Sequence, residues 1–216
     1  MKLYLCGIKS YQLDLGIECT VFSDPRLERT LQGIKRDHNE PDRQDRTLLT
    51  RPYLLQILGV LGTENYEDVV IHAAFTLAFA AFLRVGEFTY RQIDIETGPL
   101  FRSWFLTKSS IQLQDWNGET YIKLLLLASK TAPFWHGIEL TISASNDPGC
   151  LVRAMKRLAR IDSHRQQLAP LFCVGRDEQR PLTREYVVRT LQDLAIRSGL
   201  GRGAWNGHSF RRGAAT

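Results

Sequence analysis

The sequence has 216 residues, of which 44% are hydrophobic and 24% are charged. This composition excludes a disordered, fibrous or low-complexity chain and is typical of a globular protein with one or two domains. The net charge of +5 and the pI of about 9.1 are only mildly basic. The four cysteines are far apart and none has zinc-ligand spacing, so we expect reduced thiols, no metal ion and an intracellular protein.

The basic residues are concentrated in the last third of the sequence. Residues 151–216 contain 13 Lys and Arg against 5 Asp and Glu, whereas residues 1–150 contain 15 against 18. Twelve of those 13 cations are arginines, and arginine enrichment favours phosphate recognition over simple solubility. An arginine-rich face that is only solvated is the alternative.

The N-terminal part predicts two helices and a linker. Apolar residues recur with loose helical spacing up to Gly16, and Ser23-Asp24-Pro25 is a good start for a second helix. The polar run over residues 37–47 indicates a linker. We therefore expect a partial helical domain with its linker at residues 1–47 and a larger domain at residues 48–216. The first 36 residues are too few for an independent core, so these helices belong to a helical domain or lean on another element.

A buried helix is predicted in the larger domain, after a shorter helix over residues 51–61. Val69–Leu83 is the most apolar run, and it is shorter than the ~20 residues of a membrane span. We therefore expect a core helix over Tyr66–Leu83 and no membrane association. Arg84 follows directly, and Glu87 is placed to pair with it. On the local sequence alone, this pair could be a helix-end salt bridge without any chemistry.

Three strand-like segments follow, at Trp104–Gln114, Tyr121–Ala128 and Gly137–Ile142, with a turn signal at Asn117-Gly118. They predict a small antiparallel three-stranded sheet in a mainly α protein, an α+β fold. Lys130 falls at or near the tip between the second and third strands. A lone lysine at such a tip is usually only solvated.

A basic helix and a further helix are predicted after the sheet. The first runs from Asp147-Pro148 to about Ile161 and carries basic residues at positions i, i+3, i+4 and i+7. This stripe suits either a nucleic-acid backbone or solvent. The second runs over residues 184–198 and ends in a G-x-G-x-G run that follows a helix, so it is no dinucleotide-binding fingerprint. The four residues of the stripe are Arg153, Lys156, Arg157 and Arg160.

The final stretch, Gly207–Thr216, places His208 and Arg211 three residues apart at an expected helix start. In a helix these two side chains share one face. Arginine can grip a phosphate oxygen with parallel hydrogen bonds, and histidine can donate or accept a proton near pH 7. The pair therefore indicates a phosphate-binding site, with a capped helix end as the alternative.

Three elements stand out in chain order: Arg84 after the buried helix, Lys130 near the hairpin tip, and His208 with Arg211. Together they resemble the catalytic domain of tyrosine recombinases, the phage-integrase-type family, and within it the Crypton-type recombinases of eukaryotic mobile elements. The resemblance extends over nearly the whole chain, with residues 1–36 similar to the last helices of the family's DNA-clamping domain. The motifs are Phe82-Leu83-Arg84-Val85-Gly86-Glu87-Phe88, Ser129-Lys130-Thr131 and His208-Ser209-Phe210-Arg211-Arg212-Gly213-Ala214-Ala215-Thr216.

The resemblance implies a role for each of these residues. Arg84 and Arg211 would grip the scissile phosphate, and Glu87 would support the site. Lys130 would protonate the leaving 5′ oxygen, and His208 would transfer protons and bind the phosphate. Arg212 and the basic stripe would contact the DNA backbone. The reaction, DNA strand breakage and rejoining through a phosphotyrosine, would need neither a metal ion nor another cofactor.

The sequence departs from the family pattern at the nucleophile. In the family, a further His or Trp and the nucleophilic Tyr follow the H-x-x-R motif, whereas all seven tyrosines here precede His208. The chain as given, which is truncated at its C-terminus relative to the family, should therefore bind DNA without cleaving it.

Three readings of the function follow. The first is a site-specific recombinase or integrase of a transposable element, acting on double-stranded DNA, in the nucleus if the source is eukaryotic. The family acts as a tetramer, so a homo-oligomer on DNA is possible, although weak without the C-terminal segment. The second is a non-enzymatic DNA-binding protein that retains the fold, and the third is a helical scaffold whose arginine-rich end is only surface. A metal-dependent nuclease is disfavoured, because no carboxylate pair accompanies the Arg and His residues.

Overall fold

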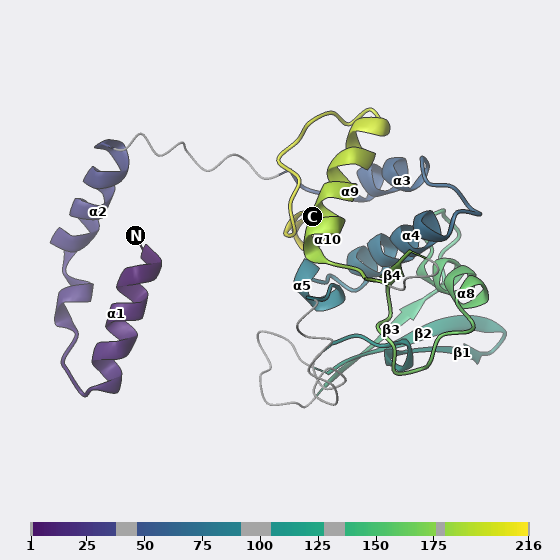
Figure 1. Cartoon of the computed structure of the whole chain (residues 1–216), viewed down its shortest axis with the longest axis horizontal. Helices are drawn as coiled ribbons and strands as arrows, with labels where there is room; N and C mark the ends of the chain where they lie inside the picture. The colour runs from purple at the N-terminus through teal and green to yellow at the C-terminus, as the bar shows by residue number, and fades with distance from the viewer. Residues whose placement is uncertain (1, 38–46, 92–104, 128–136, 176–179, 216) are drawn as a thin grey trace. The chain divides into compact units, whose positions relative to one another are not determined.

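A computed structural model describes residues 2–37, 47–91, 105–127, 137–175 and 180–215 of the chain. The chain divides into two compact units, Met1–Gln44 and Asp45–Thr216 (Figure 1). Each unit is described by itself. The expected hairpin tip with Lys130 lies outside the described residues.

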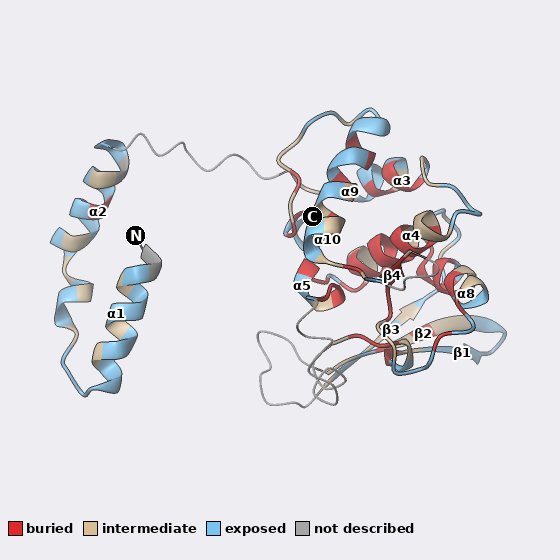
Figure 2. Ribbon diagram, in the orientation of Figure 1, coloured by how far each residue is buried: buried red, intermediate tan, exposed pale blue. Residues whose placement is uncertain are grey.

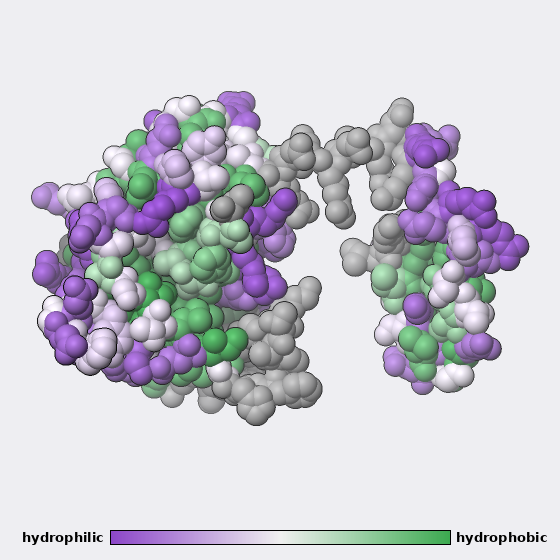
Figure 3. Space-filling model, turned by 180° about the vertical axis from the view of Figure 1, so that it is seen from behind, coloured by the Kyte–Doolittle hydropathy of each residue, from purple (hydrophilic) through white to green (hydrophobic). Residues whose placement is uncertain are grey.

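The smaller unit consists of α1 (Lys2–Asp14), a short 3-10 helix η1 (Thr20–Ser23) and α2 (Pro25–Asp37). The second helix begins where the sequence predicts, because the Asp24 carboxylate accepts the backbone amide of Arg26 at 2.8 Å. Hydrophobic side chains reach the surface of this unit (Figure 3), and Leu31 is its buried apolar side chain among the described residues. Tyr4, Tyr11 and Leu15 are among the apolar residues of this unit that are exposed.

The larger unit is built around α4 (Tyr66–Ala80), which is buried along most of its length (Figure 2). It packs against four helices of this unit and against the short strand β4 (Cys173–Val174). Because α4 is apolar on nearly every side, it can serve as the core for elements that surround it. Those four helices are α3 (Arg51–Leu58), α5 (Val85–Phe88), α8 (Leu151–Ile161) and α10 (Ser209–Ala214). A fifth helix, α9 (Arg184–Arg197), packs against α3 and α5. Among the described residues, no helix has the length and apolar character needed to cross a membrane.

A three-stranded antiparallel sheet, in the order β1-β2-β3, completes the mainly α unit, so the predicted α+β fold is confirmed. Its strands are β1 (Ile111–Trp116), β2 (Glu119–Leu126) and β3 (Ile138–Ser143). Asn117 and Gly118 turn β1 into β2 with φ values of 51° and 82°, as expected for a tight hairpin turn. The buried side chains of Ile122 and Leu124 form the inner face of the sheet, and α8 contacts β2 and β3.

The first strand begins later than the sequence predicts. Residues 108–110 form a 3-10 helix, η3 (Lys108–Ser110), in place of a strand. The Ser110 hydroxyl accepts the backbone amide of Thr107 at 3.0 Å, and Thr107 forms an isolated bridge with Pro170. Serine and threonine hydroxyls that bond to nearby backbone compete with strand pairing, which explains the difference.

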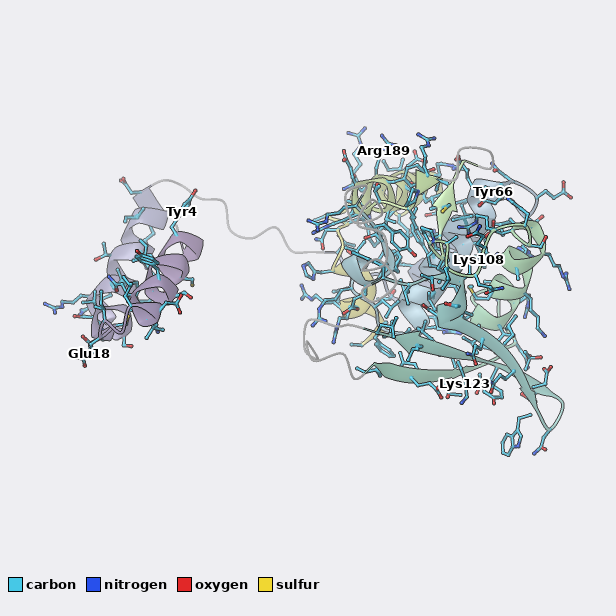
Figure 4. The ribbon with its side chains drawn as sticks, turned by 60° about the horizontal axis from the view of Figure 1, so that its bottom comes forward. Tyr4, Glu18, Tyr66, Lys108, Lys123 and Arg189 are labelled. Atoms are coloured by element: carbon cyan, nitrogen blue, oxygen red, sulfur yellow. The ribbon has the colours of Figure 1, made fainter. Side chains whose placement is uncertain are left out.

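A buried ion pair joins the end of α8 to β4. The Arg165 guanidinium bonds to the Asp162 carboxylate and also donates to the backbone carbonyl of Leu171 at 3.1 Å. Lys108 donates to the carbonyl oxygens of Asp162 and Arg165 at 2.6 and 3.0 Å. Burial and the nearby charge of Asp162 raise the pKa of Tyr66 to about 12. Figure 4 labels Tyr66 and Lys108, both in the larger unit. The pair fixes the loop between α8 and β4, because a buried charge must keep its partners.

We expect Gly213→Ala to destabilise the larger unit. A Cβ at Gly213 would lie 2.0 Å from the carbonyl oxygen of Leu49, so α10 could not keep its place. Urea unfolding should show a loss of about 2 to 3 kcal/mol of stability. Gly86→Ala is the control, because a Cβ at Gly86 would meet nothing within 4 Å. It should leave stability unchanged or raise it by up to about 1 kcal/mol. Equal effects of the two substitutions would contradict this account of Gly213.

Candidate functional site

The C-terminal end of α4 sets the position of Arg84. The helix ends earlier than the predicted Leu83. The amide of Phe82 donates to the carbonyl of Phe79 at 3.3 Å, and the amide of Leu83 donates to the carbonyl of Ala78 at 2.8 Å. This pair of bonds is the Schellman arrangement that closes a helix, with Phe82 in the left-handed conformation at φ 54°. Leu83 is buried, so the chain turns and presents Arg84 just outside the core.

Arg84 is the residue before α5, and Glu87 holds it at both its backbone and its side chain. One carboxylate oxygen of Glu87 accepts the Arg84 amide at 2.7 Å, and the other accepts from Nη1 of the guanidinium at 3.0 Å. The side chains of Arg84 and Glu87 are 30% and 15% exposed. The guanidinium makes no other bond to a described residue, so its remaining donors are available to a ligand. The salt bridge predicted from the sequence is therefore present and leaves Arg84 partly open.

A tight turn positions His208 and Arg211. The Asn206 side chain accepts the His208 amide at 2.9 Å, and the Ser209 hydroxyl accepts the Asn206 amide at 3.0 Å. His208 caps α10, and the amide of Arg212 donates to its carbonyl at 3.2 Å. The side chains of His208, Arg211 and Arg212 are exposed, whereas Ser209 is buried. The first turn of α10 therefore presents one imidazole and two guanidinium groups to solvent.

Phe210 anchors α10 against the same elements that carry Arg84. Its ring lies 5.0 Å from the ring of Phe75 on α4 and 5.8 Å from that of Phe88 on α5, both edge to face. All three rings are fully buried. Edge-to-face rings bury a large apolar area and add specific geometry. The buried face of α10 is thus locked to α4 and α5.

The segments that carry Arg84 and His208 pass in direct contact. A Cβ at Gly207 would lie 2.4 Å from Cγ1 of Val85, so only glycine permits this approach. Gly207 immediately precedes His208, and Val85 immediately follows Arg84. The structure therefore brings together two motifs that lie more than one hundred residues apart in the sequence.

Arg184 is a further cation close to Gly207, and the sequence analysis did not identify it. Its Nε lies 3.7 Å from the position of a Cβ on Gly207, and its side chain is exposed. It begins α9, whose start is held beside α5 because the Tyr90 amide donates to the Leu182 carbonyl at 2.9 Å. A cation in the first turn opposes the helix dipole. Arg51 at the start of α3 shares this misfit, so the sequence alone does not single out Arg184.

The basic stripe of α8 belongs to a different region of the unit. Figure 1 shows α8 apart from α5 and α10. Lys156 donates to the Thr120 hydroxyl at 2.8 Å and Arg153 donates to the Ser145 carbonyl at 3.4 Å, so the stripe lies alongside the sheet. The structure does not bring the stripe together with Arg84 and His208. The stripe residues are Arg153, Lys156, Arg157 and Arg160.

The described part of the chain holds no group of three or more His, Cys, Asp or Glu side chains that could bind a metal ion. The four cysteines form no disulfide, and burial raises the pKa of the Cys173 thiol to about 11.

No protein-family model matches the sequence, and no curated protein matches it. Among solved structures, the chain is similar to a lambda integrase in the crystal structure of a dimer bound to a COC′ core site. The TM-score is 0.48 at 17% sequence identity, over 81% of this chain and 41% of the integrase chain. The chain thus spans less than half the length of that integrase. A likeness of this size assigns this chain neither a family nor a function.

We expect Glu87→Ala to weaken both the start of α5 and the placement of Arg84. The substitution leaves the Arg84 amide without its acceptor, so thermal unfolding should show a loss of about 1 kcal/mol. Glu87→Gln is the matched control, because its side-chain oxygen can still accept that amide. It should recover most of the stability. A Glu87→Ala protein as stable as the wild type would show that this cap contributes nothing.

Proposed function

We propose that the domain of residues 48–216 binds double-stranded DNA and holds one backbone phosphate between Arg84 and Arg211, with His208 beside it. The contact of Gly207 with Val85 carries the proposal, because it joins the two motifs at one place. The exposed donors of Arg211 and the open donors of Arg84 suit the oxygens of a phosphodiester. Arg184 and Arg212 extend the positive surface along a DNA backbone.

The chemistry that fits this arrangement is phosphoryl transfer without a metal ion. A phosphodiester resists attack because its negative charge repels nucleophiles. In the transition state, charge gathers on the equatorial oxygens, and two fixed guanidinium groups stabilise it there. His208 can move a proton, and Lys130 is the proposed acid for the leaving 5′ oxygen. These roles correspond to those of a tyrosine recombinase or integrase, which breaks and rejoins DNA through a phosphotyrosine.

The tyrosines of this sequence do not supply that nucleophile in the family's order, since all seven precede His208. Tyr90 is fully buried, and burial raises its pKa while its hydroxyl donates to the Leu106 carbonyl at 2.6 Å. Burial also raises the pKa of Tyr66 to about 12. Such hydroxyls are poor nucleophiles. The proposal for the chain as given is therefore DNA binding without cleavage.

A second candidate function is a non-enzymatic DNA-binding protein that keeps the recombinase fold. The Crypton-type motifs extend the first candidate to a mobile element of a eukaryote, acting in the nucleus. A covalent adduct with DNA separates the two candidates.

We expect DNA binding to depend steeply on salt. Each arginine that neutralises a phosphate releases counterions, so Arg84→Ala and Arg211→Ala should each lower the slope of log K against log salt by about 1. Fluorescence anisotropy with a labelled duplex at several salt concentrations measures these slopes.

Arg197→Ala is the control for this experiment. Arg197 lies at the far end of α9 from Arg184 and pairs with Asp193 at 3.7 Å. Its removal should leave the slope unchanged. Equal slopes for the wild type, Arg84→Ala and Arg211→Ala would refute the phosphate site, and an absence of binding at low salt would favour a scaffold.

We expect the 216-residue protein to form no covalent adduct with a nicked suicide DNA substrate, because no tyrosine follows His208. A denaturing gel separates a phosphotyrosyl-linked species from free DNA. The control is the same substrate in a mobility-shift gel, where binding should be visible. A covalent band that disappears on substitution of one tyrosine would overturn this expectation.

A further inference from the structure

Phe82 holds an unusual backbone conformation two residues before Arg84. Its φ of 54° lies in the left-handed region, where the Cβ of an ordinary residue comes too close to the following carbonyl oxygen. Asn117 is the other described residue, glycine apart, with positive φ, and asparagine tolerates this region well. A bulky aromatic residue does not. Glycine would close α4 at position 82 without strain.

The Phe82 ring does not supply the apolar contact that usually accompanies this kind of helix end. The apolar contact that accompanies this kind of helix end comes from the next residue, Leu83, which is buried together with Ala78. Phe82 is 50% exposed as a residue, and no ring contact joins it to an aromatic side chain among the described residues. The strained backbone conformation of Phe82 therefore accompanies a residue that is half exposed to solvent.

Phe82 lies close to the phosphate site along the chain. Two residues span at most about 7 Å between Cα atoms, so Phe82 and Arg84 are near neighbours, and Leu83 between them is buried whereas Phe82 is half exposed. In DNA, the deoxyribose next to each phosphate carries apolar C–H groups, and each base has an apolar face. An aromatic ring next to a phosphate-binding arginine is suited to pack against them.

We infer that the Phe82 ring packs against the deoxyribose and base of the nucleotide next to the phosphate held by Arg84. The inference rests on the proposed DNA-binding function of the site and adds an apolar contact to it. Strain that the local structure does not require is typical of a residue kept for binding. The ring supplies affinity that is independent of counterion release.

The test compares Phe82→Gly, Phe82→Ala and Phe82→Trp in the full chain. Phe82→Gly and Phe82→Ala both remove the ring, but only glycine removes the strain. Glycine should therefore give a thermal midpoint about 2 to 4 °C above that of alanine. Both should weaken binding of a fluorescein-labelled DNA duplex about tenfold. Phe82→Trp keeps an aromatic ring, so its affinity should stay within about twofold of that of the wild type. This change is much smaller than the one expected when a ring contact is lost.

The salt dependence separates this contact from the arginines. Removal of the ring should lower the affinity at every salt concentration without changing the slope of log K against log salt, whereas Arg84→Ala should lower the slope by about 1. A loss of affinity that follows the thermal midpoint across the variants would indicate an effect on folding and overturn the inference.

The outcome also distinguishes this inference from the proposed function. If Arg84→Ala weakens binding while Phe82→Gly binds as tightly as the wild type, the ring contact is wrong and the phosphate site stands. If neither substitution changes binding, the proposed function fails and the ring contact fails with it. A more stable Phe82→Gly protein that binds about tenfold more weakly, a loss in the range of one aromatic contact, supports the ring contact.

Discussion

The close approach of α10 to the rest of the larger unit is the constraint on which the candidate site depends. Gly213 lies against the backbone of Leu49, and Phe210 fills the space between Phe75 and Phe88. Neither contact involves a charged group. Because α10 is short, its own hydrogen bonds stabilise it little, and its position comes from this packing. The placement of His208 and Arg211 is therefore a consequence of apolar contacts on the opposite side of the same helix.

The electrostatics of the site follow from that packing. Arg84 and Arg184 belong to segments that approach Gly207 in the turn before α10, Arg211 lies on α10 itself, and Glu87 bonds to Arg84. Cations that lie near one another repel each other, and this repulsion is relieved when an anion binds among them. The core thus fixes the elements that carry these charges relative to one another. A phosphate diester is an anion whose geometry suits several guanidinium groups at once.

Two residues near the site break local rules of protein structure. Phe82 occupies a left-handed position that favours glycine, and Arg184 stands at the positive end of a helix. Other local choices agree with the fold. Thr183 caps α9 by accepting the amide of Tyr186 at 3.2 Å, and Asn117-Gly118 turns the hairpin. Such exceptions are typical of functional sites, where a residue needed for binding is kept although it lowers the stability of the fold.

The sequence by itself determined the elements and the fold class. The apolar run of α4, the turn at Asn117-Gly118 and the cap at Thr183 are local signals, and each fixes structure within a few residues. The salt bridge of Arg84 with Glu87 was predictable for the same reason. The tertiary structure decided which of these elements meet. The contact of Gly207 with Val85, the neighbourhood of Arg184 and the separation of α8 from α10 depend on packing between distant segments. The spacing of residues along the chain does not predict these contacts, because they depend on how the side chains of distant segments pack together in the core.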